Sequence, residues 1–241
     1  MTLKAVTFDF WGTLVDAGHD LRAQRAELLC RYLPDCSLER ALQAYARAWA
    51  EFTHEIDQGY GLTPQTVLSL TLDDLDANLA PPDRTAVLRA WQEAILRVPP
   101  PLLPGVRGVL RELRGRGLLI GLISDTGVSP GRVLRQFLAS KGLIALFDWM
   151  TFSDETGVTK RRPQAFLYTL RALGVRPEEA MHVGDLPSTD VEGARAAGMH
   201  TALVLESSAR REAIPLADIV LERIRYLPSA LAQWEARQAR Q

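Results

Sequence analysis

Four short clusters hold the side chains of this chain that are equipped for chemistry. They are Asp9-Phe10-Trp11-Gly12-Thr13, Ser124-Asp125-Thr126-Gly127, the segment around Lys160, and Gly184-Asp185 with Asp190. Each comes directly after an apolar run or directly before a helical pattern. Because α/β folds place reactive groups at the carboxyl ends of their strands, we expect these clusters to meet at one edge of a sheet. Carboxylates and an ammonium gathered there suit the binding of a divalent cation and of a phosphoryl group.

The elements that must position these clusters are indicated by the apolar patterns around them. Strand-like runs lie at 3–8, 118–124, 149–152, 180–183, 200–205 and 219–221. Helical patterns lie near 105–115, 130–140, 163–173, 188–197 and 225–239. Strands that alternate with helices in this way predict an α/β fold, with a parallel sheet that is covered by helices on both faces.

The stretch 17–98 interrupts this alternation, since it shows no clear strand pattern. It predicts helices instead, at about 20–33, 38–58, 64–79 and 83–97. Pro99-Pro100-Pro101, followed by Pro104-Gly105, ends the helical pattern and predicts a stiff return to the sheet. We therefore expect a core domain made of 1–16 and 99–241, with 17–98 inserted as a helical cap above the carboxyl ends of the strands.

Within the expected cap, one loop is the best candidate to point at a pocket. It is the helix break at Gln58-Gly59-Tyr60-Gly61, and inserted caps of this kind close over a site and choose its substrate. Tyr60 would then stack on a substrate or hydrogen-bond it, although a surface aromatic in a turn is an equally good interpretation. The many arginines of 17–98 are expected mostly on solvated faces.

The composition narrows the class of protein. A chain of 241 residues that is 47% hydrophobic and 24% charged is expected to form one globular core with an insertion. Its formal net charge of -1 provides no electrostatic case for binding nucleic acid or an anionic membrane. No apolar run approaches the roughly 18 residues of a membrane span, and the early first strand leaves no room for a signal peptide. With Cys30 and Cys36 interpreted as buried thiols rather than a disulfide or a metal site, we expect a cytoplasmic protein.

The four clusters, in this order, resemble the motifs of the haloacid dehalogenase superfamily of hydrolases, and the resemblance covers the whole chain. Its most specific parts are Asp9-x-x-Gly12-Thr13 and Gly184-Asp185-x-x-x-x-Asp190, which runs into Gly193-Ala194-x-x-Ala197-Gly198-Met199. The Pro104-Gly105 return and the proline three residues after Lys160 are similar to that family as well. The resemblance implies a Rossmann-like, three-layer core with a mostly parallel sheet, an inserted all-helical cap, an aspartyl nucleophile, and usually a Mg²⁺-dependent phosphatase acting on a small phosphorylated substrate.

The chemistry of the residues agrees with what the resemblance implies. Asp9 is the expected nucleophile, and Lys160 is the cation that offsets repulsion between this carboxylate and an anionic phosphate. The expected phosphate-binding residues are Ser124, Asp125, Thr126 and Lys160. The expected Mg²⁺ ligands are Asp9, the backbone carbonyl of Trp11, Asp185 and Asp190, with Asp190 steadying a coordinated water. His182 and His200, within or at the start of strands, are expected to be structural. The protein is expected to be a monomer or a homodimer, with no nucleic acid or membrane as a partner.

Trp11 departs from the phosphatase pattern. In that branch of the family, an acid two residues beyond the nucleophile protonates the leaving oxygen and later activates water. An indole does neither, and such proton transfer is worth about 10²–10⁴-fold in rate. One explanation is a substrate with a good leaving group, such as an acyl or aryl phosphate. Another is a substitute acid, Asp125 or Asp16, where repulsion from Asp9 and Asp185 would raise the pKa of Asp125 and keep it protonated.

The third explanation is a 2-haloacid dehalogenase, the branch in which an aromatic residue at this position is familiar and whose halide leaves without a proton. Asp185 and Asp190 argue against it, because that reaction uses no metal and two acids would repel a carboxylate substrate. Phosphonate hydrolysis would need a Schiff-base lysine in the cap, and 17–98 contains no lysine. A slow or silent member that binds a phosphorylated ligand or a protein partner is a further alternative. We rank a metal-dependent phosphatase first and a dehalogenase second.

Overall fold

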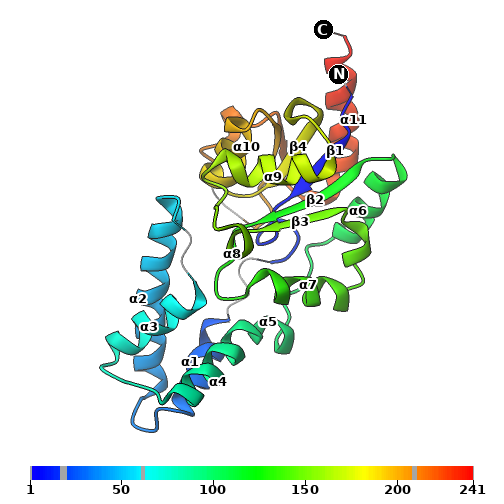
Figure 1. The fold of residues 1–241 in the computed structure, drawn as a ribbon. Coiled ribbons are helices and arrows are strands. Elements are labelled where there is room, and N and C mark those ends of the chain that lie inside the picture. Colours follow the sequence, from blue (N-terminus) through cyan, green and yellow to red (C-terminus); the bar gives the residue numbers. More distant parts are fainter. Residues whose placement is uncertain (1, 17–20, 61–62, 208–210, 241) are drawn as a thin grey trace.

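The computed structural model describes residues 2–16, 21–60, 63–207 and 211–240. Its strands form one parallel sheet in the order β3-β2-β1-β4-β5-β6. The strands are β1 (Ala5–Phe8), β2 (Leu119–Ser124), β3 (Trp149–Phe152), β4 (Ala180–Gly184), β5 (His200–Val204) and β6 (Ile219–Leu221). The predicted α/β fold with a parallel sheet is confirmed, and β1 lies in the middle of the sheet between β2 and β4 (Figure 1).

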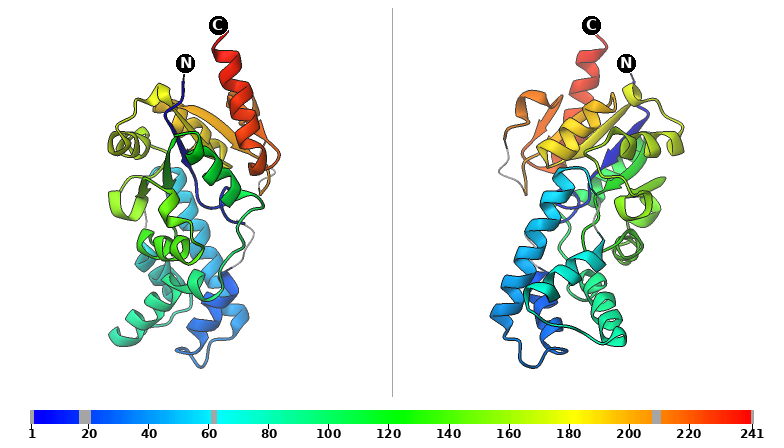
Figure 2. Two further views of the ribbon diagram at one scale, coloured as in Figure 1. Left: turned by 90° about the vertical axis from the view of Figure 1, so that its right-hand side faces the viewer. Right: turned by 60° about the vertical axis from the view of Figure 1, so that its left-hand side comes forward.

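Helices cover both faces of the sheet and give the three layers of a Rossmann-like core (Figures 1 and 2). One face is covered by α6 (Val106–Gly115), α7 (Gly131–Ser140) and α11 (Leu227–Gln238). The other face is covered by α9 (Pro163–Leu173) and α10 (Glu192–Ala196). A single helical turn that the sequence pattern did not predict, α8 (Ser153–Thr156), follows β3 directly.

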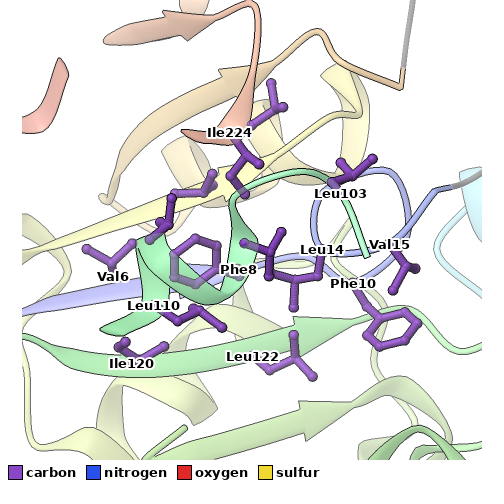
Figure 3. Packing of buried hydrophobic residues seen from close by; sticks show 14 of the residues in the cluster. Val6, Phe8, Phe10, Leu14, Val15, Leu103, Leu110, Ile120, Leu122 and Ile224 are labelled. Carbon is purple, nitrogen blue, oxygen red and sulfur yellow. The ribbon is translucent and has the colours of Figure 1, made fainter. Parts of the chain in front are cut away.

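The alternation of side chains along β1 explains how this strand is held. Val6 and Phe8 pack into the larger apolar cluster on the α6 side (Figure 3), and Ala5 packs into the cluster on the α9 side. A parallel strand that is buried on both faces is fixed in place. The next residue, Asp9, donates its backbone N–H to the Val183 carbonyl oxygen at 2.9 Å. The nucleophile candidate is therefore anchored by the centre of the sheet.

The helices between residues 22 and 97 form a separate group at the carboxyl ends of the strands, opposite the two termini of the chain (Figures 1 and 2). They are α1 (Arg22–Cys30), α2 (Leu38–Asp57), α3 (Pro64–Asp74), α4 (Pro81–Gln92) and α5 (Ala94–Arg97). Ser37 and Thr63 begin α2 and α3, because each side chain accepts the backbone N–H three residues on at 3.3 Å. These helices pack around their own apolar cluster, which includes Tyr45 and Trp91.

Two helix ends in this group differ from the sequence expectation. The helix expected at 64–79 ends at Asp74, because Asp76 adopts a left-handed backbone conformation with a φ of 51°. The helix expected at 83–97 is interrupted at Glu93, which separates α4 from α5. Neither break involves a glycine or a proline, so the sequence contained no strong signal for it.

The division into a core and a cap stays a prediction, because one of its boundaries lies outside the described residues. The expected cap at 17–98 begins at residues 17–20, which lie outside the described residues. At that end of the core, Asp16 donates its backbone N–H to the Pro101 carbonyl oxygen at 3.1 Å. The segments that leave and re-enter the core therefore run side by side there. Across the ranges that the structure describes, no helix combines the length and the apolar character that crossing a membrane requires.

Gly193 allows α10 to approach the segment that carries Lys160. A Cβ atom at this position would lie 2.1 Å from the Lys160 carbonyl oxygen and 2.9 Å from the Phe166 ring. A side chain here would have to push a backbone atom rather than a flexible side chain. The position of the Lys160 backbone therefore depends on this glycine.

We expect Gly193→Ala to lower the free energy of unfolding by about 1–3 kcal/mol, because the added methyl group overpacks this contact. The matched control is Gly108→Ala in α6, where nothing lies within 4 Å of the added Cβ atom. There the higher helix propensity of alanine should raise the free energy of unfolding by about 0.5–1 kcal/mol. Urea denaturation followed by circular dichroism measures both. Equal effects of the two substitutions would contradict a constraint at Gly193.

Candidate active site

Residues from three of the four clusters meet at the carboxyl ends of β1 and β4. Asp9 directly follows β1, Asp185 directly follows β4, and Asp190 lies in the π-helical turn Pro187–Val191. One carboxylate oxygen of each lies within 4.8 Å of the other two. The Lys160 ammonium donates to Asp9 Oδ1 and, at 2.5 Å, to Asp190 Oδ1. All four side chains are buried, so three carboxylates and one ammonium share a site with little solvent.

Two glycines make room for the acidic side chains. Gly12 has a φ of 77°, and a Cβ atom there would lie 2.5 Å from Asp185 Oδ2. A Cβ atom at Gly184 would lie 2.2 Å from Asp190 Cγ. The backbone must approach both carboxylates more closely than any side chain permits. This is the physical reason why glycine stands at both positions of the motif.

Asp190 is the most fully hydrogen-bonded of the three acids. Its Oδ2 accepts the backbone N–H groups of Asp185 and Leu186 at 3.1 and 2.9 Å. Its Oδ1 accepts from Lys160 and faces His182 Nε2 at 3.2 Å. Burial alone would raise the pKa of Asp190, but Lys160 and His182 hold it below its ordinary value. Asp190 is therefore an ionised carboxylate whose two oxygens are both occupied by protein donors.

Asp9 and Asp185, the other two acids of the site, have too few cationic partners to offset their burial. Burial raises the pKa of Asp9 to about 7 and the pKa of Asp185 to about 8, and repulsion from the neighbouring carboxylates adds to both shifts. Burial would lower the pKa of Lys160, but Asp190 and Asp9 outweigh it and hold this pKa above its ordinary value. The ammonium thus stays charged, and one lysine offsets only part of the charge of three carboxylates.

The residues present fit a divalent cation. Carboxylate oxygens are the ligands that Mg²⁺ prefers, and Asp185 Oδ1 is buried with no hydrogen-bond partner in the part of the chain that the structure describes. A buried acceptor of this kind calls for a partner. Asp9 and Asp185 would hold the ion directly, while Asp190, with both oxygens occupied, suits the steadying of a water on the ion. The backbone carbonyl of Trp11 stays a predicted ligand.

The members of the second cluster have separate partners. Asp125 Oδ1 accepts the backbone N–H of Lys160 at 2.9 Å, which fixes the lysine from its backbone side. The N–H of Thr126 donates to Ser153 Oγ at 2.8 Å, so this amide is used within the protein. Ser124 is buried at the end of β2. The phosphate-binding roles of these three residues stay predictions, and the geometry favours a supporting role for Asp125 and Thr126.

The pKa of Asp125 is raised, as predicted, but the predicted cause of the increase is wrong. Burial raises the pKa of Asp125 to about 6, while Lys160 opposes this increase and repulsion from Asp190 adds to it. Repulsion from Asp9 and Asp185 is not among its causes, because the Asp125 carboxylate turns toward the Lys160 backbone. Its Oδ2 is buried without a hydrogen-bond partner in the described chain, so this carboxyl keeps one oxygen for a proton.

Trp11 packs against the core. Its side chain is partly buried beside the larger apolar cluster, edge-on to Phe10 with ring centroids 5.0 Å apart. An indole in this position transfers no proton to a leaving group. Asp16, the other proposed substitute acid, lies where the chain leaves the core toward the cap and is only partly buried.

The cap contacts the core through the loop that follows β2. Val128 belongs to the apolar cluster of the cap, and a Cβ atom at Gly127 would lie 2.8 Å from the Trp49 ring. Arg25 is buried in α1 and donates to Ser129 Oγ at 3.3 Å. The cap arginines were expected mostly on solvated faces, and the buried Arg25 is an exception. Its guanidinium also donates to the Trp91 carbonyl oxygen at 3.3 Å and to the Tyr45 hydroxyl at 2.8 Å, so its burial depends on tertiary partners that no local sequence pattern reports.

The cap loop that was expected to point at the pocket lies against the core near Lys160. A Cβ atom at Gly59 would lie 3.5 Å from Arg162 Nε, two residues beyond the lysine. Tyr60 is 60% exposed. This exposure is compatible with a contact to the substrate and with a surface aromatic in a turn. Gly61 lies outside the described residues.

His182 is the residue of the site that sequence reasoning missed. It was expected to be structural, yet its Nε2 faces Asp190 and its Nδ1 lies 2.8 Å from Thr7 Oγ1. Burial holds the pKa of His182 below its ordinary value. The available signal was the alternation in β4, where this polar residue stands between the apolar Met181 and Val183, in a strand that ends at the site.

Comparison with known proteins places these residues in a family context. The sequence model of haloacid dehalogenase-like hydrolases matches residues 3–198. The chain is 30% identical to glyceraldehyde 3-phosphate phosphatase from Methanopyrus kandleri, over 83% of this chain and 82% of that protein. It is 41% identical to phosphoserine phosphatase from Thermus thermophilus, but over only 43% of this chain and 41% of that protein. It is also 30% identical to phosphoglycolate phosphatase from Pseudomonas putida, over 81% and 67% of the two chains.

Solved structures with two different named activities share this fold. A HAD phosphatase from Thermococcus onnurineus aligns with a TM-score of 0.71 at 26% identity, over 95% of this chain and 98% of that one. A 2-haloacid dehalogenase from Pseudomonas syringae aligns with a TM-score of 0.70 at 25% identity, over 97% and 100%. The fold therefore does not discriminate between the two reactions, and the residues of the site must do so.

Without metal ions, we expect the melting temperature to fall as the pH rises from about 6.5 to 8. In that range Asp9 and Asp185, with raised pKa values of about 7 and about 8, bind protons in the folded state that unfolded carboxyls of pKa 3.8 have lost. The lowered pKa of His182 adds a pH dependence of opposite sign, which fades as the pH rises above its unfolded value of 6.5.

Millimolar Mg²⁺ should reverse the fall in melting temperature at high pH. The increase should be larger at pH 8 than at pH 6.5, because binding of the ion needs ionised carboxylates. Thermal denaturation in chelator and in Mg²⁺ measures the increase at each pH. Asp185→Asn, which removes a proposed ligand, is the control and should abolish the increase. A Mg²⁺ effect that does not change with pH would contradict this assignment of the shifted carboxyls.

Proposed function

Because the chain belongs to the haloacid dehalogenase-like hydrolase family, we propose that it is a Mg²⁺-dependent phosphatase of small phosphorylated metabolites with Asp9 as its nucleophile. The observation that carries the proposal is the buried Lys160 ammonium between Asp9 and Asp190, with the Asp185 carboxylate beside them. Relatives that are named as phosphatases of phosphoserine, glyceraldehyde 3-phosphate and phosphoglycolate support the class of reaction.

In the proposed reaction, an oxygen of Asp9 attacks the phosphorus atom, the bond to the leaving oxygen breaks, and an aspartyl phosphate forms. Water then attacks the phosphorus atom of this intermediate, which releases inorganic phosphate and restores Asp9. Lys160 holds the nucleophile in place and offsets the negative charge of the phosphoryl oxygens. A bound Mg²⁺, held by Asp9 and Asp185 with the Trp11 carbonyl and Asp190 as further predicted partners, would supply additional charge neutralisation there.

Supporting residues complete this arrangement. Asp125 holds the Lys160 backbone and Thr126 holds Ser153, so both would act on the phosphate indirectly. Ser124, at the end of β2 next to β1, is the proposed direct contact besides Lys160. Cradling a phosphate with side chains from neighbouring strand ends requires little movement of the sheet.

Trp11 sets the proposed substrate class. The relatives are named for alkyl phosphates, whose alkoxide leaving groups need a proton. This chain has an indole at position 11, where the resemblance places the acid, and the first candidate for a substitute, Asp125, directs one carboxylate oxygen to the Lys160 backbone N–H. The leaving group of an acyl or aryl phosphate is a carboxylate or a phenolate, which leaves without protonation. Substrates of this kind therefore fit the site best.

A 2-haloacid dehalogenase is the second candidate. Trp11 favours it, because a leaving halide needs no proton, and a dehalogenase from Pseudomonas syringae shares the fold at 25% identity. The two acids that follow β4 argue against it. Asp185 has a buried oxygen without a hydrogen-bond partner among the described residues, and a site with this excess of carboxylates repels the carboxylate of a haloacid.

The compartment and partners belong to the same proposal. Two free thiols, Cys30 and Cys36, are typical of a reducing compartment and support the cytoplasm. The net charge of -1 supports a small molecule rather than nucleic acid or a membrane as the partner. We keep a monomer or a homodimer as the expected state.

We expect the protein to hydrolyse an aryl phosphate such as p-nitrophenyl phosphate in the presence of Mg²⁺, and Asp9→Asn to lower kcat by at least about 10³-fold, since no nucleophile remains. A chelator should abolish turnover of the unchanged protein. Release of chloride from 2-chloropropionate in chelator would favour the dehalogenase instead. Failure of both assays, with ligand-dependent protection against heat, would indicate a binding protein.

Across phosphate esters graded by the acidity of the leaving group, we expect kcat/KM to rise steeply as the leaving group becomes more acidic. Trp11→Asp should raise turnover of alkyl phosphates by about 10-fold or more, because it restores a carboxyl for proton transfer. Trp11→Asn is the matched control, because asparagine has the size of aspartate but no acidic proton, and this variant should not raise turnover of alkyl phosphates. A flat dependence in the unchanged protein would mean that another group already supplies the proton.

A further inference from the structure

A chain of buried hydrogen bonds continues from the site into the sheet. It runs from Thr7 of β1 through His182 of β4 to Asp190, and from Asp190 through Lys160 to Asp9. Thr7 and His182 are register partners on adjacent strands, and they are only 0% and 1% exposed. The reaction described above uses Lys160 and Asp9 but gives Thr7 and His182 no role.

The direction of these hydrogen bonds follows from Asp190. This carboxylate accepts two backbone N–H groups on Oδ2 and the Lys160 ammonium on Oδ1, a set of donors that suits its ionised form. An ionised carboxylate has no proton to give, so the His182 Nε2 that faces it must donate. A neutral ring then has its lone pair at Nδ1, which must accept from the Thr7 hydroxyl.

The surroundings of His182 leave its ring little freedom. The edge-to-face contact with Phe166 has ring centroids 5.0 Å apart and an angle of 83° between the planes. The ring nitrogens are held at both ends, by Thr7 and by Asp190. A planar group fixed in this way specifies the position of whatever it binds.

We propose that His182 is a positioning residue, which Thr7 orients and which fixes the Asp190 carboxylate and, through it, the Lys160 ammonium. This inference rests on the proposed phosphatase function. Among the described residues, Asp9 and Asp190 accept two of the three N–H groups of the ammonium, which leaves the third for a phosphoryl oxygen. Without His182, Asp190 Oδ1 would be held by Lys160 alone, and the carboxylate and the ammonium would shift together.

Two substitutions at His182 separate positioning from packing. His182→Leu fills similar space without a donor, and His182→Gln replaces the Nε2–H with an amide N–H. We expect kcat to fall by about 10–100-fold in His182→Leu, the range for losing a hydrogen bond to a charged group, with KM changed less than about threefold. His182→Gln should retain kcat within about fivefold. His200→Leu, a histidine at the start of β5 that packs on Trp234, is the matched control and should leave kcat unchanged.

The proposal is overturned if His182→Gln loses as much activity as His182→Leu, because a packing role would treat both alike. It is also overturned if neither variant loses activity. Melting temperatures of the three variants show how much of any loss comes from unfolding.

A second measurement needs no turnover. Nitrogen-15 spectra of the imidazoles distinguish the two neutral tautomers, and the chain contains only four histidines, so His182→Gln assigns the signal. We expect the Nε2–H form in the unchanged protein, and in Thr7→Val the same form with a shifted Nδ1 resonance. An Nδ1–H form would overturn the hydrogen-bond chain even in an active phosphatase. An Nε2–H form in a protein without phosphatase activity would instead overturn the proposed function and, with it, the catalytic part of this inference.

Discussion

The buried ammonium of Lys160 is the interaction on which the site depends. It binds Asp9 at the end of β1 and Asp190 beyond β4, and these residues are far apart along the chain. Carboxylates removed from water destabilise a fold unless a cation pairs with them. One ammonium does this for only part of the charge, because Asp185 lies within the same group. The same deficit of positive charge that makes the site costly to fold suits it to a further cation.

The rest of the core is arranged around this ion pair. β1 is buried on both faces and places Asp9 rigidly, while Asp125 holds the backbone of Lys160. Gly12 and Gly184 let the backbone pass the acidic side chains at distances that a Cβ atom would forbid. The site is thus built from strand ends and close backbone contacts, which move little. The cap, which we expect to select the substrate, contacts the core through side-chain packing and hydrogen bonds such as Arg25 to Ser129.

Much of this architecture was predictable from the sequence. The apolar runs located the strands, and the order of the four clusters placed their reactive residues at one edge of a parallel sheet. Local features were less accessible. The end of α3 at Asp74 depends on the conformation of Asp76, and the burial of Arg25 depends on partners that lie 20, 66 and 104 positions away along the chain. The raised pKa of Asp125 was expected, but its cause was wrong, because the direction in which a carboxylate turns is set by its tertiary neighbours.

The sequence by itself determined the α/β alternation, the family and the identities of the acids and the lysine, because hydrophobic periodicity and motif spacing are local properties of the chain. Only the tertiary structure decided which acid pairs with which donor. Both oxygens of Asp190 accept from protein donors, whereas Asp185 has a buried oxygen with no donor among the described residues, although both are aspartates of the same motif. Hydrogen-bond direction and burial arise from segments that are distant in sequence, and for this reason the contacts of His182 with Thr7 and Asp190 became visible only once β1 and β4 lay side by side.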